Sequence, residues 1–333
     1  MIIAWAAFLL LVGGLLAFDL GVMNRHEHVI SVREAFRNTA LFAALALAFG
    51  GVVYLAYDHQ WFGLGTQPDA IDRVMNTGRI ALVKYLTGYV VELSLSTDNV
   101  FVIALIFQHL RVPATYQHRV LFWGILGALV MRGTMIAVGA QLVARFHWLL
   151  LLFGLFLLYT AAKMLLSKGG DAVDEPDENA LVAFFRKVLP VTSTEHGHDF
   201  FVKEAGRWML TPLAVCLLLV ETTDLLFAVD SIPAIFAITT DAFIVFTSNV
   251  FAILGLRSLY FALAGAMDRF HHLKTALAIV LGIVGAKMLA SDWLAERFGP
   301  GVNNWLLALI AAILSGAVVI SLVGERKGKK GGE

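Results

Sequence analysis

Five acidic side chains interrupt two apolar runs of the chain that are long enough to cross a lipid bilayer. The run 82–110 contains Glu92 and Asp98, and the run 213–238 contains Glu221, Asp224 and Asp230. An ionised carboxylate at the centre of a bilayer costs about 2.5–3.5 kcal/mol on the lenient insertion scale. Five would cost on the order of 12–17 kcal/mol, which is comparable to the net stability of an ordinary domain. We therefore expect these acids either to form an ion pathway or to be cancelled by partners.

The composition is that of a membrane protein. Of the 333 residues, 59% are hydrophobic and only 15% are charged, whereas about 25% are charged in soluble proteins. We therefore expect an all-α polytopic protein whose surroundings are the lipid bilayer. The formal net charge of +0 gives no reason to expect a nucleic-acid partner. The single cysteine, Cys216, excludes an internal disulfide bond and a thiolate metal site.

About nine transmembrane helices are predicted from apolar runs of about twenty residues. They cover approximately residues 2–20, 40–57, 80–108, 119–143, 147–166, 209–238, 242–264, 273–290 and 303–323. Only Met1 precedes the first run, without the basic region of a signal peptide, so we expect this run to remain as a span. Lys and Arg gather in alternate connections, sixteen against four. This asymmetry predicts an outside N-terminus and a cytoplasmic C-terminus.

Two groups of three spans resemble each other. The string Ala-Lys-Met-Leu ends one span at 162–165 and another at 286–289, and a lone arginine, Arg132 or Arg257, precedes it at nearly the same distance. Because three spans are an odd number, the copies would have opposite orientations, as in the inverted repeats of transporters. The predicted parts are two N-terminal spans (1–60), a first repeat (80–166), a cytoplasmic loop (167–208), a second repeat (209–292), a C-terminal span (302–323) and a basic disordered tail (324–333).

The acid-bearing runs predict an ion site made of oxygen atoms. Pro233 and the pairs Asp98-Asn99 and Asp230-Ser231 favour interruption of both helices, which would free backbone carbonyls beside the carboxylates. No histidine falls within either run, so the site suits Mg²⁺, Ca²⁺ or Mn²⁺ better than zinc or copper. Further oxygens would come from hydroxyl side chains, namely Ser96, Thr97, Thr222, Thr223 and Ser231.

Basic residues within the spans have several interpretations. Arg132 and Arg257 are either structural counter-ions of the acids or gating partners. Lys163 and Lys287 lie at span ends, where we expect their amines to extend to the lipid headgroups. Asp19, at the end of the first span, is either an interface residue or part of a metal access route.

Three segments carry a family resemblance. The strings at 92–101 (ELSLSTDNVF), 221–236 (ETTDLLFAVDSIPAIF) and 247–261 resemble the signature blocks of the TerC family, bacterial integral membrane proteins, in particular its Alx-like members. The resemblance implies the bacterial inner membrane, metal-ion homeostasis with manganese export, and a link to tellurite resistance. The functional positions that it implies are Glu92, Asp98, Asn99, Glu221, Asp224 and Asp230.

The leading hypothesis is a secondary exporter of a divalent cation, Mn²⁺ by the resemblance. An exchange for two protons would be electroneutral, although the sequence fixes neither coupling nor stoichiometry. A Gly-x-x-x-x-Gly-Lys-[ST] loop is absent, so we expect no nucleotide cofactor and no enzymatic activity. An intramembrane aspartyl protease is one alternative, but neither Asp98 nor Asp230 follows Gly-x-Gly. The other is a membrane-protein assembly or tellurite-linked factor without transport, for which the sequence names no protein partner.

Overall fold

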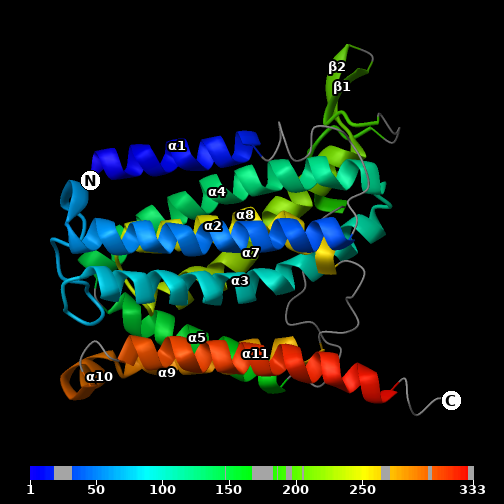
Figure 1. Ribbon diagram of the computed structural model, residues 1–333. Coiled ribbons are helices and arrows are strands. Elements are labelled where there is room, and N and C mark those ends of the chain that lie inside the picture. The colour runs from blue at the N-terminus through cyan, green and yellow to red at the C-terminus, as the bar shows by residue number, and fades with distance from the viewer. Residues whose placement is uncertain are drawn as a thin grey trace.

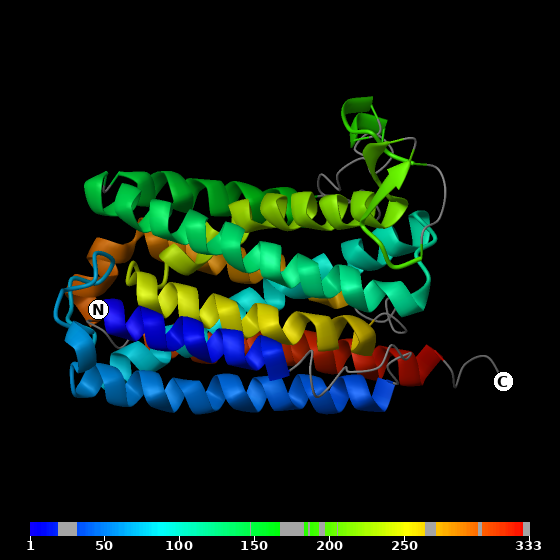
Figure 2. The same cartoon turned by 90° about the horizontal axis from the view of Figure 1, so that it is seen from above.

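Long helices lie side by side and run in alternating directions (Figures 1 and 2). The computed structural model describes residues 1–18, 32–146, 148–166, 183–185, 187–192, 197–204, 206–263, 271–298 and 302–328. Its elements are α1 (Ile2–Phe18), α2 (Val32–Asp58), η2 (Trp61–Gly63), α3 (Gly78–His109), α4 (Ala114–Arg145), α5 (Leu149–Leu166), β1 (Phe201–Glu204), β2 (Arg207–Leu210), α7 (Pro212–Phe236), α8 (Ala242–Leu263), α9 (His271–Leu289), α10 (Ser291–Phe298) and α11 (Val302–Gly328).

Nine apolar helices in the described part of the chain correspond to the nine predicted spans. Six of them, α2, α3, α4, α5, α7 and α8, are long and apolar enough to cross a bilayer, and α1, α9 and α11 contain shorter apolar stretches. The expected all-α polytopic fold is therefore confirmed. We call the end of the bundle that holds the N-terminus, residues 59–77 and residues 237–241 the N face, and the opposite end the C face (Figure 1).

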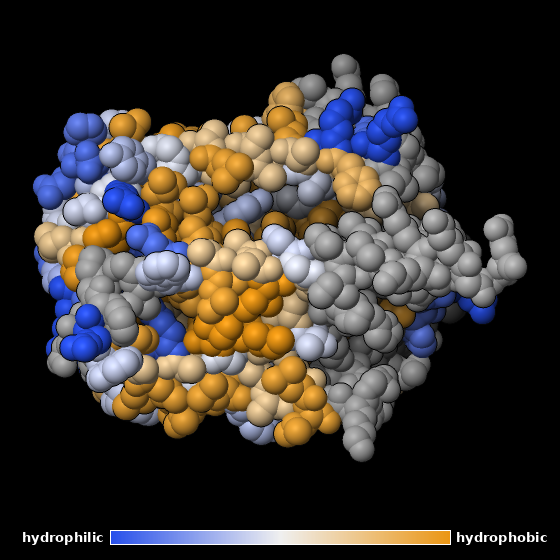
Figure 3. All heavy atoms as spheres, turned by 60° about the horizontal axis from the view of Figure 1, so that its bottom comes forward, coloured by the Kyte–Doolittle hydropathy of each residue, from blue (hydrophilic) through white to orange (hydrophobic). Residues whose placement is uncertain are grey.

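The surface matches a membrane environment. On the face shown in Figure 3, hydrophobic side chains cover the middle of the bundle, and hydrophilic side chains gather at the N face. Helix α5 also exposes several large apolar side chains, among them Leu151, Leu155 and Tyr159. Such exposure would be unfavourable in water over so large an area, but it is ordinary against lipid tails.

The two predicted repeats pack closely against each other. Helix α5 lies along α9, α3 lies along α8, and α4 lies along α7. In the predicted repeats, α3, α4 and α5 correspond to α7, α8 and α9. If the two repeats exchanged places, the α3–α8 pair would become the α7–α4 pair, and the α5–α9 pair would stay the same. This arrangement is the one that an inverted repeat requires, and the repeat itself stays a prediction.

The predicted interruption of the acid-bearing helices is wrong, since α3 and α7 are both continuous. Pro233 lies in the last turn of α7, so the loss of its bond to the Val229 carbonyl affects only the end of the helix, which stops three residues later. The hydroxyls of Thr97 and Thr222 donate to the carbonyls of Leu93 and Leu218, four residues earlier, at 2.8 and 2.7 Å. These bonds follow the helix instead of competing with it.

Three other expectations need correction. Lys287 does not extend to the headgroups: it is buried and donates to the Ala237 carbonyl oxygen at 2.7 Å, because carbonyls at the end of α7 lack helical partners. The segment predicted as a loop contains the antiparallel β1–β2 hairpin, which projects from the bundle near the C face (Figure 1). The tail predicted as disordered from residue 324 is helical through Gly328, because its charged residues favour helix and continue α11.

The crossing of α5 and α9 depends on glycines. A Cβ atom on Gly285 would lie 3.0 Å from the Gly154 carbonyl oxygen and 3.2 Å from the Leu158 backbone nitrogen. Neither backbone atom can move aside without moving its helix. Close approach of this kind is how helices associate in lipid, where apolar burial gives no driving force between them.

We therefore predict that Gly285→Leu lowers the free energy of unfolding by about 1–3 kcal/mol, because the side chain separates α5 from α9. Gly51→Leu is the matched control, since Gly51 is exposed on α2 and a Cβ there would meet nothing within 4 Å. Both variants gain the same helix propensity, so their difference isolates the packing. Thermal unfolding in detergent measures it, and equal midpoints would contradict the tight crossing.

Candidate functional site

The centre of the site is the guanidinium group of Arg132, in the middle of α4. Arg132 is only 1% exposed. Its Nη2 and Nε donate to the two carboxylate oxygens of Asp224 on α7, at 2.8 and 3.1 Å. Its Nη1 forms an ion pair with Glu92 on α3, whose side chain is fully buried. One buried cation therefore joins carboxylates from two different helices.

Neutral side chains complete the shell around these three charges. Arg132 Nη1 also donates to Asn249 Oδ1 at 3.1 Å and to Ser231 Oγ at 3.3 Å. Asn249 and Ser96 in turn donate to the Glu92 carboxylate, at 3.3 and 2.9 Å. We refer to Arg132, Glu92, Asp224 and these three polar residues as the Arg132 centre.

Asn249 is a member of the centre that sequence reasoning missed. It lies in α8, which carries none of the five acids. The available signal was the polar string Thr247-Ser248-Asn249 in an otherwise apolar helix, in which all three residues are buried. A buried amide in a membrane helix must satisfy its polar atoms inside the protein, so such a string indicates an internal network.

The two acids of the centre hold equivalent places in the predicted repeats. Glu92 precedes Asp98 by the same interval as Asp224 precedes Asp230. Arg132 thus contacts one acid of its own repeat and the matching acid of the other. This convergence near the middle of the membrane is the geometry expected of a binding site between inverted repeats.

The other predicted site residues are not among the contacts that the structure gives for Arg132. The Glu221 carboxylate packs against Gly127 of α4, where a Cβ atom would collide with it. Asp230 accepts a hydrogen bond from Thr160 of α5 at 3.5 Å. Arg257 is buried in α8. The side chain of Asp98 and the whole of Asp19 lie outside the described part of the structure.

The described side chains of the predicted ligands form no metal cluster. Among the described residues, no group of three or more His, Cys, Asp or Glu side chains is close enough to hold a metal ion. The two acids that do meet are occupied by Arg132. Whether all six positions act as metal ligands therefore stays a prediction.

Two buried oxygens near these acids in sequence have no hydrogen-bond partner among the described residues. They are Asn99 Oδ1 on α3 and Thr223 Oγ1 on α7, with residue exposures of 3% and 2%. An unsatisfied buried polar group costs about 1–3 kcal/mol. Both helices that carry the acids thus also hold an oxygen that water or a cation could satisfy.

Comparison with known proteins agrees with this architecture. Residues 77–329 match the integral membrane protein TerC family. The chain belongs to the TerC family. This TerC protein is 47% identical to the uncharacterised membrane protein STKORF319 of Myxococcus xanthus over 322 residues, which is 97% of the chain and 92% of the relative. No solved structure gives a significant match.

Other relatives cover most of the chain as well. Alx of Escherichia coli K12, whose name describes a candidate membrane-bound redox modulator, is 42% identical over 292 residues, which is 87% of the chain and 86% of Alx. An uncharacterised membrane protein of Rickettsia bellii is 36% identical over 97% of the chain and its own full length. The family and the apolar helices together establish a multi-pass integral membrane protein.

The Arg132 centre leads to a prediction about stability. Arg132→Met leaves the Glu92 and Asp224 carboxylates buried without their cation, so the free energy of unfolding should fall by about 3–5 kcal/mol. The triple variant Glu92→Gln, Arg132→Met, Asp224→Asn removes the uncompensated charge and should recover most of this loss. Unfolding in denaturant at fixed detergent concentration measures both variants.

Arg145→Met is the matched control, because Arg145 lies exposed at the end of the same helix. It should leave stability nearly unchanged. If Arg132→Met were as stable as this control, the ion pairs of the centre would not contribute to the folded state.

Proposed function

We propose that this protein is a secondary transporter that exports a divalent metal cation through the Arg132 centre, with Mn²⁺ as its substrate. One observation carries the proposal. Carboxylates from α3 and α7 hold a positive charge between them, deep among apolar helices. A point in the membrane that already accommodates one cation is suited to accommodate another.

Charge favours a divalent ion at this point. Arg132 supplies one positive charge to two carboxylates, so the three groups together carry one net negative charge. A divalent cation between the same carboxylates would neutralise them fully, if Arg132 turned away. When no substrate is bound, Arg132 then occupies the substrate site. It acts both as a counter-ion of the two acids and as a gating residue.

The donor atoms fit a hard cation. Carboxylates, the amides of Asn99 and Asn249 and the hydroxyl of Thr223 all offer oxygen, which suits Mg²⁺, Ca²⁺ and Mn²⁺. Neither helix of the acid pair contributes a sulfur or an imidazole near the centre. The choice of Mn²⁺ among these three ions rests on the family resemblance.

Direction and coupling follow from charge as well. The concentration of Lys and Arg at the C-face connections supports a cytoplasmic C face in a bacterial inner membrane. Carboxylates that release a divalent cation on the far side can take up protons for the return step. Exchange of one cation for two protons would be electroneutral, and no nucleotide takes part.

The test is Mn²⁺ flux into liposomes that contain the purified protein. Glu92→Gln and Asp224→Asn should each reduce flux by more than about tenfold, since each removes a ligand charge. Asp98→Asn should do the same. The matched control is Asp199→Asn, an exposed acid outside the bundle helices. Competition with Mg²⁺ and Ca²⁺ establishes the ion preference.

The alternatives give different outcomes in the same experiment. An assembly or resistance factor without transport would leave the vesicles at the background of protein-free liposomes, even for the unmodified chain. If folded Glu92→Gln and Asp224→Asn variants showed normal flux, the protein would still be a transporter, but the assignment of its site to these residues would be wrong. An intramembrane protease would cleave a membrane substrate without moving metal.

Glu221 can be tested without changing its own chemistry. Gly127→Ala places a methyl group where the Glu221 carboxylate lies, so the carboxylate must move. If Glu221 guides the cation, flux should fall by about 10- to 100-fold, as it does when a positioning group is displaced. Gly124→Ala is the matched control one turn away, where the new methyl group would lie 3.3 Å from Val220 Cγ1 and from no carboxylate. Equal flux in both variants would place Glu221 off the pathway.

A further inference from the structure

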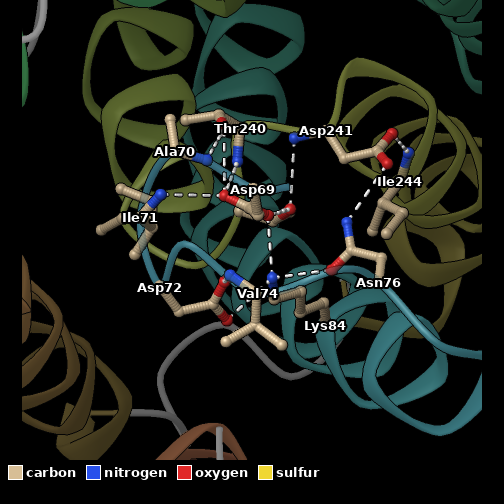
Figure 4. A network of polar contacts seen from close by, with 12 residues as sticks. Asp69, Ala70, Ile71, Asp72, Val74, Asn76, Lys84, Thr240, Asp241 and Ile244 are labelled. Carbon is tan, nitrogen blue, oxygen red and sulfur yellow. Dashed lines mark hydrogen bonds and ion pairs between the residues drawn. The ribbon is translucent and has the colours of Figure 1, made fainter. Parts of the chain in front are cut away.

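A second buried ionic network lies at the N face (Figure 4). Its cation is Lys84, near the beginning of α3. The amine lies 2.8 Å from Asp69 Oδ2 and 2.9 Å from Asp72 Oδ2, and it donates to Asn76 Oδ1 at 2.8 Å. The side chains of Lys84 and Asp69 have no solvent exposure. Three oxygens therefore surround one ammonium group.

Asp69 connects this network to the second predicted repeat. Its Oδ1 accepts hydrogen bonds from the backbone nitrogen and the hydroxyl of Thr240, at 3.1 and 3.0 Å, and its Oδ2 accepts one from the Thr239 hydroxyl. Burial by itself would raise the pKa of Asp69, but Lys84, the Thr239 hydroxyl and the Ile71 backbone nitrogen lower the pKa to about 2. Asp69 is thus an ionised link between residues 65–77 and the turn after α7.

Neighbouring contacts hold the other helix ends of the N face. Lys287 of α9 donates to the carbonyl oxygen of Ala237, just after α7. Asn76 donates to Asp241 Oδ2 at 3.3 Å, and Asp241 Oδ1 accepts from the Phe243 backbone nitrogen at the start of α8. Polar contacts at the N face therefore hold the ends of α3, α7, α8 and α9 together.

The path beneath this network is closed. All residues from 231 to 239 are buried. Ala234 and Ile238 belong to one packed apolar cluster with Val91 and Leu95 of α3. Nothing as large as an ion passes between the Arg132 centre and the N face without separation of these helices, because packed interiors leave few voids of the size of a water molecule.

The C face is different. A cavity of about 460 Å³ lies between the C-face ends of α3, α4 and α8, lined by residues that include Ala104, Phe107, Gln108, Gln117 and Tyr260. Ala104 is about 7.5 Å further along α3 than Asn99, at the usual helical rise. Along α3, Asn99 thus lies between this cavity and Glu92, and the next turn, with Val100 and Ile103, belongs to a packed apolar cluster.

We propose that the Asp69–Lys84 network is the N-face gate of the transport pathway, and that the structure is the state closed at the N face. This inference rests on the proposed function. Buried ion pairs suit a gate because they add little net stability to the closed state, and their charged groups regain hydration when the gate opens. The closed and open states can then be close in free energy, as a switching element requires.

Thiol labelling tests the gate without any metal. A single reporter, Ala234→Cys, is placed in a Cys216→Ser background beneath the network, and the purified protein in lipid nanodiscs is treated with a charged methanethiosulfonate reagent. Asp69→Asn should raise the labelling rate of the reporter by about tenfold, which corresponds to about 1.4 kcal/mol in the opening equilibrium. A second reporter, Gln108→Cys, which is exposed and lines the C-face cavity, should label readily with and without Asp69→Asn.

Two controls separate gating from loss of structure. Asp58→Asn is the matched acid, since Asp58 is exposed at the end of α2, outside the network, and it should leave the Ala234→Cys rate unchanged. The native Cys216, which has no exposure and lies in the other half of α7, reports unfolding when it is retained without a reporter. It should stay protected in Asp69→Asn.

Two results overturn the gate. The reporter stays protected in Asp69→Asn if the network does not control access. The reporter and Cys216 become reactive together if the network only holds the fold. Since labelling needs no transported ion, failed flux with intact gating would count against the proposed function and not against the gate.

Discussion

Glu92, Asp224 and Arg132 lie deep among apolar helices, where none of them could remain ionised alone at acceptable cost. Each is tolerable only because the others are present, and each comes from a different helix: α3, α7 and α4. The ion pairs therefore fix how these helices approach one another, which apolar packing in lipid does only weakly. Asn249 adds α8 to the same arrangement. The mutual positions of the two predicted repeats thus depend on this one shared charge.

The N-face network uses the same principle at a different depth. Lys84 contacts two carboxylates and one amide, those of Asp69, Asp72 and Asn76. Arg132 likewise contacts the carboxylates of Glu92 and Asp224 and the amide of Asn249. In both places a tethered cation satisfies carboxylates, and hydrogen bonds reach across to the second repeat. If the ion pairs and hydrogen bonds of these two centres change partners, the bundle can change conformation without repacking its apolar core. Packed apolar cores have discrete arrangements and resist gradual deformation, so polar centres are the easier elements to switch.

Much of the fold could be read from the sequence, because a bilayer requires long apolar runs and leaves few other solutions. The acids and Arg132 were also visible, since charge within such a run is costly. The helix interruption predicted at Pro233 was wrong because position within the helix decides the effect of proline. Asn249 was missed because α8 carries none of the five acids, although its polar string was visible. The Asp69–Lys84 network was missed because short polar residues in a connection look solvated, and only the folded chain shows that Asp69 is buried under the turn 237–241.

The charge of the tethered cations bears on what could replace them. The Arg132 guanidinium donates two hydrogen bonds to Asp224 and also pairs with Glu92. A mobile ion can displace it only if the ion neutralises the two carboxylates at least as well as Arg132 does. A monovalent ion offers the same charge without the directed hydrogen bonds, so it competes poorly. A divalent ion offers twice the charge to the same oxygens, and its attraction to both acids grows in the low-dielectric interior. If an ion replaces Arg132 as proposed, the charge of the centre therefore favours divalent ions before any ligand geometry is considered, and its oxygen donors disfavour the softer metals.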